Sequence, residues 1–321
     1  MLRFGICTRE QYEREAGRRN LAASEISYNL MDVGEDATEE EVRLFESISF
    51  SLRTSNGTTR MTFSDRFRDV DETTSRILGR FFAADAALLV QDRAMSHGLT
   101  SCEWAHKLFR AFPRAQVEAS DRILFLYRIS LSNEETFILE PDGHPLQYVR
   151  PPFVVSIGHR EPLRFPLNHL VSLRARWRFR RLALPEGWRD SQGGKGYKIT
   201  KICCVHPKAR LLAKKDPRFR ICTRSVFDRT PGISVLRTMN ILNKAYFSPD
   251  QLVDGAMAAF ESLEPGGIWI VGRTLEEDST NHVTFLKKRE DDWELLERIG
   301  GGSEMEEFVA RGPALFQEQS R

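Results

Sequence analysis

Three polar side chains that could position a reacting group follow an apolar run in the C-terminal half of the chain: Asn240, Asn243 and Tyr246. Amide and phenol groups can orient a substrate by hydrogen bonds, although each could equally satisfy the backbone of its own loop. The apolar run itself, residues 233–239, is typical of a buried strand. Because parallel sheets bind ligands beyond the carboxyl ends of their strands, we interpret this loop as a candidate catalytic segment.

A second group of candidate residues follows two earlier apolar runs. Asp92 lies just after residues 86–90, and Asp121 lies just after residues 115–119. Gly98 closes the loop after Asp92, and glycine lets a backbone adopt left-handed conformations and approach a ligand closely. Asp121 is open to two interpretations: it binds a ligand, or it is a strand-end residue that caps the next turn.

The elements that must hold these residues alternate between strands and helices. Thr100 with Glu103 forms a capping box for a helix between the two early strands. Ser248 with Gln251 begins another helix after the candidate catalytic segment, and the apolar run 268–271 then predicts a further strand. Strand–helix–strand units of this kind belong to a parallel α/β sheet.

The two ends of the chain differ from this pattern. Residues 1–80 show no strand alternation, and helices are expected near 39–50 and 71–82, so we predict a helical N-terminal extension or lid. Residues 283–287 and 293–299 alternate across a charged turn, which predicts an antiparallel hairpin at the end of the sheet. A second hairpin is predicted from the patterns at 137–139 and 146–149, separated by the turn sequence Pro141-Asp142-Gly143.

Several of these residues carry a resemblance to a known superfamily. The order of elements over about residues 80–300 resembles the class I S-adenosylmethionine-dependent methyltransferases. Residues 237–240, 246–247 and 263–267 are similar to the corresponding part of the chemotaxis-receptor methyltransferases and of uncharacterised bacterial relatives. The resemblance implies an α/β fold with a Rossmann-like, mostly parallel seven-stranded sheet and helices on both faces.

The resemblance also implies a cofactor site for S-adenosyl-L-methionine. The superfamily's first motif, an acid followed by three alternating glycines, aligns with residues 92–98, where Ala94 and Ser96 replace two of the glycines. Ser96 could bond the carboxylate of the cofactor. The cofactor-binding residues implied in this way are Asp92, Ser96, His97, Gly98, Asp121, Ser225, Val226, Phe227 and Arg237.

Within this set, Asp121 matches the acid that binds the ribose. Ser225 stands near the expected adenine position, with Val226 and Phe227 as an apolar wall, and Asp228 replaces Ser225 if the register differs. Phe227 could also be an ordinary core residue. Arg237 lies inside a strand pattern, and a buried arginine needs a partner, for which Asp92 and Asp228 are the candidates. His97 and His159 are possible general bases, although loop histidines are often only solvated.

The resemblance places one methyltransferase-like domain at 81–321, with an insertion at about 125–215. The basic run at 174–181 lies within this insertion and alternates arginine with Ala175, Trp177 and Phe179. We expect residues 158–190 to cover the site or to meet a partner, with the arginines on a solvated face. The alternative is contact with nucleic-acid phosphates, with the aromatic rings stacked on bases.

Composition bounds the remaining properties. The net charge of +2 disfavours a general nucleic-acid binder, and the five cysteines lack paired C-x-x-C spacing, which favours reduced thiols over a metal site. The N-terminal residues lack an apolar core of signal-peptide length, and no run is long enough to span a membrane. We therefore expect a cytoplasmic protein without a membrane partner.

Two functional hypotheses follow. The first is a methyltransferase that acts on an unidentified small-molecule or protein acceptor, with Asn240, Asn243 and Tyr246 orienting that acceptor. Methyl transfer needs mainly positioning, and a base only where the acceptor loses a proton. The second is a non-catalytic relative that serves as a binding module, because the glycine motif is degraded.

Overall fold

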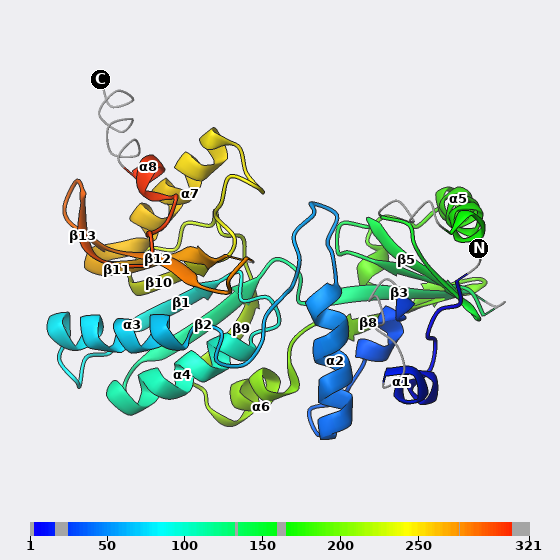
Figure 1. The fold of residues 1–321 in the computed structure, drawn as a ribbon, viewed down its shortest axis with the longest axis horizontal. Coiled ribbons are helices and arrows are strands. Elements are labelled where there is room, and N and C mark those ends of the chain that lie inside the picture. Colours follow the sequence, from blue (N-terminus) through cyan, green and yellow to red (C-terminus); the bar gives the residue numbers. More distant parts are fainter. Residues whose placement is uncertain (1–2, 17–24, 132–133, 159–164, 276, 310–321) are drawn as a thin grey trace. The chain divides into compact units, whose positions relative to one another are not determined.

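The computed structural model describes residues 3–16, 25–131, 134–158, 165–275 and 277–309 of the chain (Figure 1). The chain divides into two compact units, each described here by itself. The first unit comprises residues 1–61 and 123–207, and the second comprises residues 62–122 and 208–321. We call the first the antiparallel unit and the second the mixed-sheet unit.

The mixed-sheet unit is built on a seven-stranded sheet with the order β13-β12-β11-β10-β1-β2-β9. The five strands from β11 to β9 are parallel, whereas β12 and β13 form an antiparallel hairpin next to β11. This arrangement confirms the predicted α/β fold class. The strands are β1 (Leu89–Arg93), β2 (Gln116–Asp121), β9 (Phe219–Thr223), β10 (Ile233–Met239), β11 (Leu263–Thr274), β12 (Asn281–Lys288) and β13 (Trp293–Ile299).

Helices cover both faces of this sheet (Figure 1). The helices α3 (Arg68–Phe81) and α4 (Leu99–Ala111) lie on one face, and α7 (Pro249–Ser262) and α8 (Glu306–Val309) lie on the other. The helix α6 (Pro207–Lys215) precedes β9. Ser248 and Gln251 form the predicted capping box of α7, whose residues Leu252 and Ala259 pack in one apolar cluster with Leu236 of β10.

The start of α4 differs from the prediction. The helix begins at Leu99, and Gly98 in the left-handed conformation is its N-cap instead of Thr100. The carboxylate of Glu103, predicted to complete a capping box, instead accepts hydrogen bonds from the Ser64 hydroxyl (2.6 Å) and the Asp65 backbone N–H (3.1 Å). A partner from a distant segment has therefore replaced the local cap.

The antiparallel unit contains a six-stranded sheet with the order β6-β5-β4-β3-β8-β7, in which every neighbouring pair is antiparallel. The predicted hairpin is confirmed as β4 and β5. The strands are β3 (Phe125–Leu131), β4 (Thr136–Leu139), β5 (Pro145–Arg150), β6 (Phe153–Ser156), β7 (Gly193–Gly194) and β8 (Tyr197–Cys203). The helical elements are α1 (Arg9–Ala16), η2 (Tyr28–Met31), α2 (Glu39–Ser51), α5 (Pro166–Arg181) and η3 (Trp188–Asp190).

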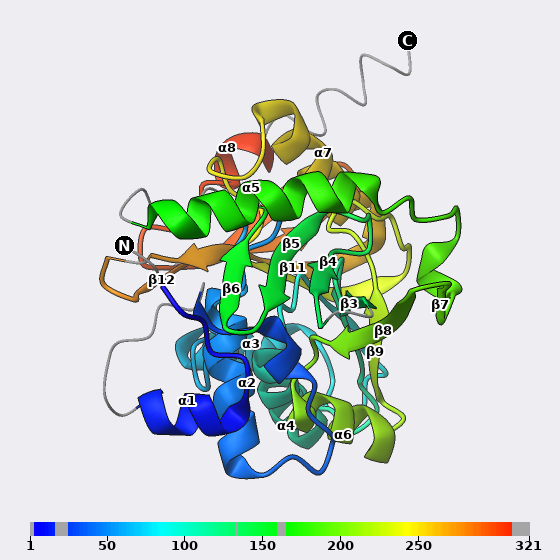
Figure 2. The same cartoon turned by 90° about the vertical axis from the view of Figure 1, so that its right-hand side faces the viewer.

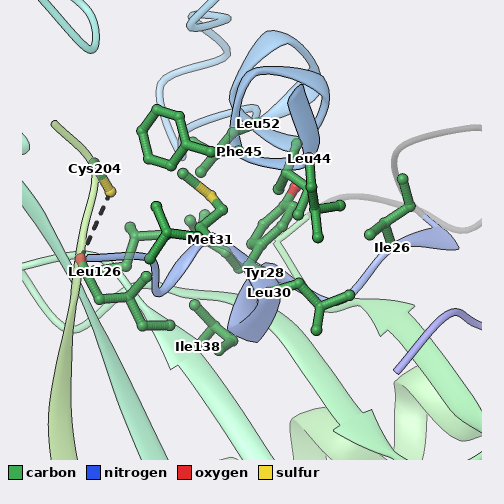
Figure 3. Packing of buried hydrophobic residues seen from close by; sticks show 14 of the residues in the cluster. Ile26, Tyr28, Leu30, Met31, Leu44, Phe45, Leu52, Leu126, Ile138 and Cys204 are labelled. Atoms are coloured by element: carbon green, nitrogen blue, oxygen red, sulfur yellow. Dashed lines mark hydrogen bonds between the residues drawn. The ribbon is translucent and has the colours of Figure 1, made fainter. Parts of the chain in front are cut away.

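The two faces of this sheet carry separate apolar clusters. Leu126 and Ile138 pack with Met31 of η2 and Phe45 of α2 on one face (Figure 3). Their strand neighbours, such as Tyr127, Ile129 and Phe137, belong to a second cluster that includes Ala175 and Phe179 of α5. Because side chains alternate along a strand, the two clusters cover opposite faces, so this sheet is buried on both sides.

The boundaries of the units differ from the expected extension and insertion. Residues 1–61 do not form a helical extension of their own but share a core with residues 123–207, and α3 belongs to the mixed-sheet unit. In the basic run at 174–181, arginine alternates with Ala175, Trp177 and Phe179, which predicted that these three residues share one face. The run is instead part of the helix α5, in which alternate residues do not share a face. Among the described residues, no helix is both long and apolar enough to cross a bilayer.

Candidate functional site

The loop that connects β1 to α4 has an alternating backbone conformation. Ala94, Ser96 and Gly98 have φ angles of 62°, 59° and 84°, all in the left-handed region. These are the three positions that align with the glycines of the methyltransferase motif. A left-handed conformation at a residue other than glycine costs roughly 1–2 kcal/mol, so Ala94 and Ser96 hold a backbone shape for which glycine is better suited. The loop thus has three left-handed residues in alternation, only one of which is a glycine.

Hydrogen bonds tie this loop to the end of β2. The backbone N–H of Ser96 donates to Oδ2 of Asp121 at 2.9 Å, and the N–H of Met95 donates to the carbonyl of Ser120 at 2.9 Å. Asp121 is half-buried and lies at the carboxyl end of β2, directly beside β1 in the sheet. The structure therefore brings together the loop and the acid that the sequence predicted as one site.

The left-handed backbone of this loop predicts opposite effects on stability for substitutions at Ala94 and at Gly98. We expect Ala94→Gly to raise the free energy of unfolding by about 0.5–1 kcal/mol, because the left-handed conformation no longer opposes a Cβ atom. Gly98→Ala is the matched control and should lower it by about 1 kcal/mol, since a Cβ atom there would lie 3.1 Å from the Sδ atom of Met95. Urea unfolding measures both, and equal signs for the two variants would contradict the conformational argument.

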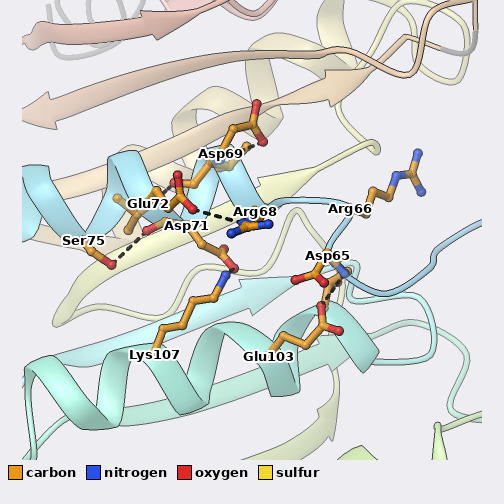
Figure 4. Close-up of polar contacts among 12 residues, drawn as sticks. Asp65, Arg66, Arg68, Asp69, Asp71, Glu72, Ser75, Glu103 and Lys107 are labelled. Atoms are coloured by element: carbon orange, nitrogen blue, oxygen red, sulfur yellow. Dashed lines mark hydrogen bonds and ion pairs between the residues drawn. The ribbon is translucent and has the colours of Figure 1, made fainter.

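Asp92 does not extend from the loop but lies in a buried charge cluster between β1, β10, α3 and α4. The Nε atom of Arg237 donates to Oδ1 of Asp92 at 2.9 Å, and the Ser101 hydroxyl donates to Oδ2 at 2.6 Å. Arg237 also donates to Oδ1 of Asp71 at 3.0 Å. Lys107 donates to Oδ2 of Asp71 at 2.9 Å (Figure 4). Of the two partners expected for Arg237, Asp92 and Asp228, the structure shows Asp92, together with Asp71, which was not expected.

Burial decides the electrostatics of this cluster. Arg237, Asp92 and Asp71 are all buried, and the guanidinium of Arg237 also lies 4.1 Å from the centre of the Trp104 ring. Burial raises the pKa of the Asp71 carboxyl, and the positive charges of Arg237 and Lys107 oppose that rise. Asp92 and Arg237 therefore form a buried ion pair that joins β1 to β10.

Arg93 lies on the opposite face of the sheet from Asp92. Its guanidinium donates to Oε1 of Gln91 at 2.8 and 2.9 Å, to the Asp228 carbonyl at 2.6 Å and to the Ser262 hydroxyl at 3.0 Å. Burial lowers the pKa of this guanidinium to about 10. Arg93 thus ties β1 to the segment after β9 and to α7. The only sequence signal was a charged residue directly at the end of a buried strand.

Residues 225–228 form a turn after β9. Oδ2 of Asp228 accepts the N–H of Ser225 at 3.1 Å, and the Ser225 hydroxyl oxygen accepts the N–H of Phe227 at 3.2 Å. The Phe227 ring packs edge-on against Phe247, with 5.1 Å between ring centres, and Val226 is buried in the same apolar cluster as α7. The core role of Phe227 therefore has contacts in the structure, and its role as an adenine wall stays a prediction.

Two of the three candidate catalytic residues make bonds within their own neighbourhood. Asn240 has a φ of 60°, and its Oδ1 accepts the N–H of Thr274 at 2.7 Å. Oδ1 of Asn243 accepts the N–H of Ala245 at 3.0 Å, and its Nδ2 donates to the carbonyl of Ile241 at 3.2 Å. These contacts hold the loop after β10 in shape.

Tyr246 and the two histidines differ in what the structure describes. Tyr246 is half-buried in the loop after β10, and its backbone N–H donates to the carbonyl of Asn243 at 3.1 Å. His97 is fully buried, between the loop of Ser96 and the start of α4. His159 lies outside the described residues. Among the described residues, no group of His, Cys, Asp and Glu side chains is arranged to hold a metal ion.

No protein-family model and no curated protein sequence matches this chain. Among solved structures, it is similar to an O-methyltransferase family protein from Burkholderia thailandensis, with 11% identity and a TM-score of 0.32 over 76% of this chain and 44% of that one. It is also similar to the CMeT domain of the citrinin polyketide synthase, with 9% identity and a TM-score of 0.36 over 83% and 51%.

A third similar structure is an O-methyltransferase from neocarzinostatin biosynthesis in complex with S-adenosyl-L-homocysteine, with 12% identity and a TM-score of 0.26 over 65% and 42%. The chain spans between two fifths and about half of the length of these three solved chains. The fold class defined above rests on the strand order of the mixed-sheet unit and not on these values. The similarity to chemotaxis-receptor methyltransferases stays a prediction.

Proposed function

We propose that the protein binds S-adenosylmethionine in the mixed-sheet unit and transfers its methyl group to a small-molecule or protein acceptor. The observation that carries this proposal is the left-handed backbone at Ala94, Ser96 and Gly98, bonded through Ser96 to Asp121 at the end of β2. A parallel sheet whose first loop approaches an acid on the second strand matches the general rule for ligand sites in α/β proteins.

The residues present fit such a cofactor. Gly98 leaves room along the loop that any Cβ atom would take up against Met95 and Ala209. A carboxylate has about four acceptor positions, so Asp121 would bind the ribose hydroxyls while its Oδ2 holds the N–H of Ser96. Bound S-adenosylmethionine would supply an activated methyl group on its sulfonium. The protein then needs mainly to align the acceptor. We assign this role to Tyr246, because the side chains of Asn240 and Asn243 are engaged by nearby backbone groups.

Calorimetry on the full chain with S-adenosylmethionine and with S-adenosylhomocysteine tests the proposal. We expect saturable heat and an upward shift of the melting temperature with both ligands, because a ligand that binds only the folded state stabilises it. Adenosine is the control, since it lacks the methionine part that the loop would hold. Gly98→Val should abolish the heat with both ligands, as a β-branched side chain crowds the loop and strains its conformation.

A non-catalytic binding module is the second candidate, and one observation favours it. The acid of the motif, Asp92, accepts hydrogen bonds from Arg237 and Ser101 and does not face the loop. If millimolar ligand gives no heat and no thermal shift, the methyltransferase proposal is rejected. The binding module is then the function that remains for this fold.

A further inference from the structure

The helix α5 has four large apolar side chains on its outer face. On the side that packs on the sheet, Asn168, Ser172 and Ala175 are buried, Val171 and Phe179 pack against the apolar cluster, and the Ser172 hydroxyl donates to the Ser156 carbonyl of β6 at 2.7 Å. Asn168 forms two hydrogen bonds with the backbone of Arg3, both of 2.8 Å. Figure 2 shows α5 lying across the strands β5 and β6. The helix is therefore held by polar contacts and close packing.

Four large apolar side chains are left on the outer face. Leu167, Leu170, Leu173 and Trp177 are between 47% and 59% exposed. Their spacing places them on one stripe of the helix, because residues three, four and seven apart lie on the same side. We call these four residues the α5 stripe. Large contiguous exposed apolar patches are uncommon on soluble proteins and mark interaction surfaces.

The charged residues of the helix α5 have one sign. Arg174, Arg180 and Arg181 are exposed on α5, and no acidic residue occurs in the helix. The guanidinium of Arg181 lies 3.4 Å from the centre of the Trp177 ring, so cation and indole form one surface. Arg178, by contrast, is held by the buried carboxylate of Glu135 at 2.9 Å.

We infer that the α5 stripe docks on an anionic lipid bilayer, with α5 in the plane of the headgroups. Leucine and tryptophan side chains would enter the boundary of the acyl chains while arginines contact lipid phosphates, the arrangement of in-plane interfacial helices. A second copy of the chain would place arginines against arginines with no acid on either helix. A nucleic acid would satisfy the arginines but leave the leucines in water.

This inference changes the expectation of no membrane partner. That expectation rested on the lack of a run long enough to span a bilayer, whereas an in-plane helix needs none. The pattern was hidden in the sequence because arginines alternate with Ala175, Trp177 and Phe179, which suggests a strand. In the helix, Ala175 and Phe179 pack in the cluster on the sheet, and Trp177 is exposed.

Sedimentation of the full chain with vesicles tests the inference. We expect binding to vesicles of phosphatidylcholine with phosphatidylglycerol, much weaker binding to phosphatidylcholine alone, and weakening as salt rises. Leu170→Ser with Trp177→Ser should weaken binding to the mixed vesicles by roughly 100-fold. Replacing Arg174, Arg180 and Arg181 by serine should weaken it on the order of 100-fold and remove the preference for anionic lipid.

Leu295→Ser is the matched control, because Leu295 is 43% exposed on β13 and lies outside the antiparallel unit. It should bind like the natural protein, and circular dichroism should show that all variants are folded. Absence of binding to the mixed vesicles would overturn the inference. It would also fail if the stripe variants dissociated a dimer, or if the arginine variant abolished tight, salt-sensitive binding of an oligonucleotide.

Discussion

Arg237→Met is expected to lower the free energy of unfolding by about 3–5 kcal/mol, because it removes the cation between two buried carboxylates. Within the described part of the chain, Asp92 is then left with the neutral Ser101 hydroxyl as donor, and Asp71 with Lys107, whose side chain is 34% exposed. The methionine also loses the contact of the guanidinium with the Trp104 ring. Urea unfolding at neutral pH measures the loss.

Protonation should partly rescue this variant. Burial already raises the pKa of Asp71 in the natural protein, and without Arg237 its main opposing charge is gone. A carboxyl with a raised pKa in the folded state favours folding below its ordinary pKa of about 4, and this contribution is lost as pH rises through the raised value. The deficit of Arg237→Met should therefore be smaller near pH 5 than near pH 8.

Two further variants separate charge from packing. Asp71→Asn in the natural background should cost less than Arg237→Met, because Arg237 then still has Asp92 and Lys107 can turn to water. Adding Asp71→Asn to Arg237→Met should recover part of the loss, since one uncompensated carboxylate disappears. A loss that is below about 1 kcal/mol and independent of pH would show that the cluster is not the electrostatic centre of this sheet.

The sequence predicted those elements of the mixed-sheet unit whose pattern lies within a single segment of the chain. β10 was found at its observed bounds, residues 233–239, because a fully buried parallel strand is a continuous apolar run. The helix α7 was found from its capping box and from apolar residues at helical spacing. The charge of Arg237 inside that run predicted a buried acid, and Asp92 was one of the two candidates named.

The antiparallel unit could not be predicted in the same way. Its core joins Met31 and Phe45 to Leu126 and Ile138, residues that are far apart in the sequence. No local pattern reports such an association, because each segment alone shows only a helix or a hairpin. The same limit applies to Glu103, whose partners Ser64 and Asp65 come from before α3.

The candidate site was predicted in its positions but not in its bonds. The motif alignment put the loop after β1 and Asp121 in one predicted site, and the two are hydrogen-bonded in the structure, whereas their binding of a cofactor stays a prediction. Glycines are the usual signal of left-handed backbone, and only Gly98 remains in this loop. Ala94 and Ser96 adopt that backbone without the signal, so the hydrogen bond of Ser96 to Asp121 could be known only from the structure. The same bond makes Asp121 the residue on which the proposed function can be tested most directly.

Asp121→Ala is expected to weaken the binding of S-adenosylmethionine by roughly 1.5–3 kcal/mol, or about 10- to 150-fold in Kd. The variant would remove a charge-assisted acceptor for the ribose and also the acceptor of the Ser96 N–H that shapes the loop. The fold should lose only about 1 kcal/mol, the contribution of one hydrogen bond at a half-buried strand end. Calorimetry and urea unfolding on the same preparations give both values.

Asp121→Asn distinguishes the two contributions, because its amide oxygen can still accept the Ser96 N–H while the negative charge is gone. We expect Asp121→Asn to lower the free energy of unfolding less than Asp121→Ala does. The affinity of Asp121→Asn for S-adenosylmethionine should lie between those of the natural protein and Asp121→Ala, since a neutral acceptor binds hydroxyls about half as strongly as a carboxylate. An unchanged Kd in Asp121→Ala would mean that Asp121 serves only the loop, and the ribose would have to be held elsewhere along the carboxyl ends of the sheet.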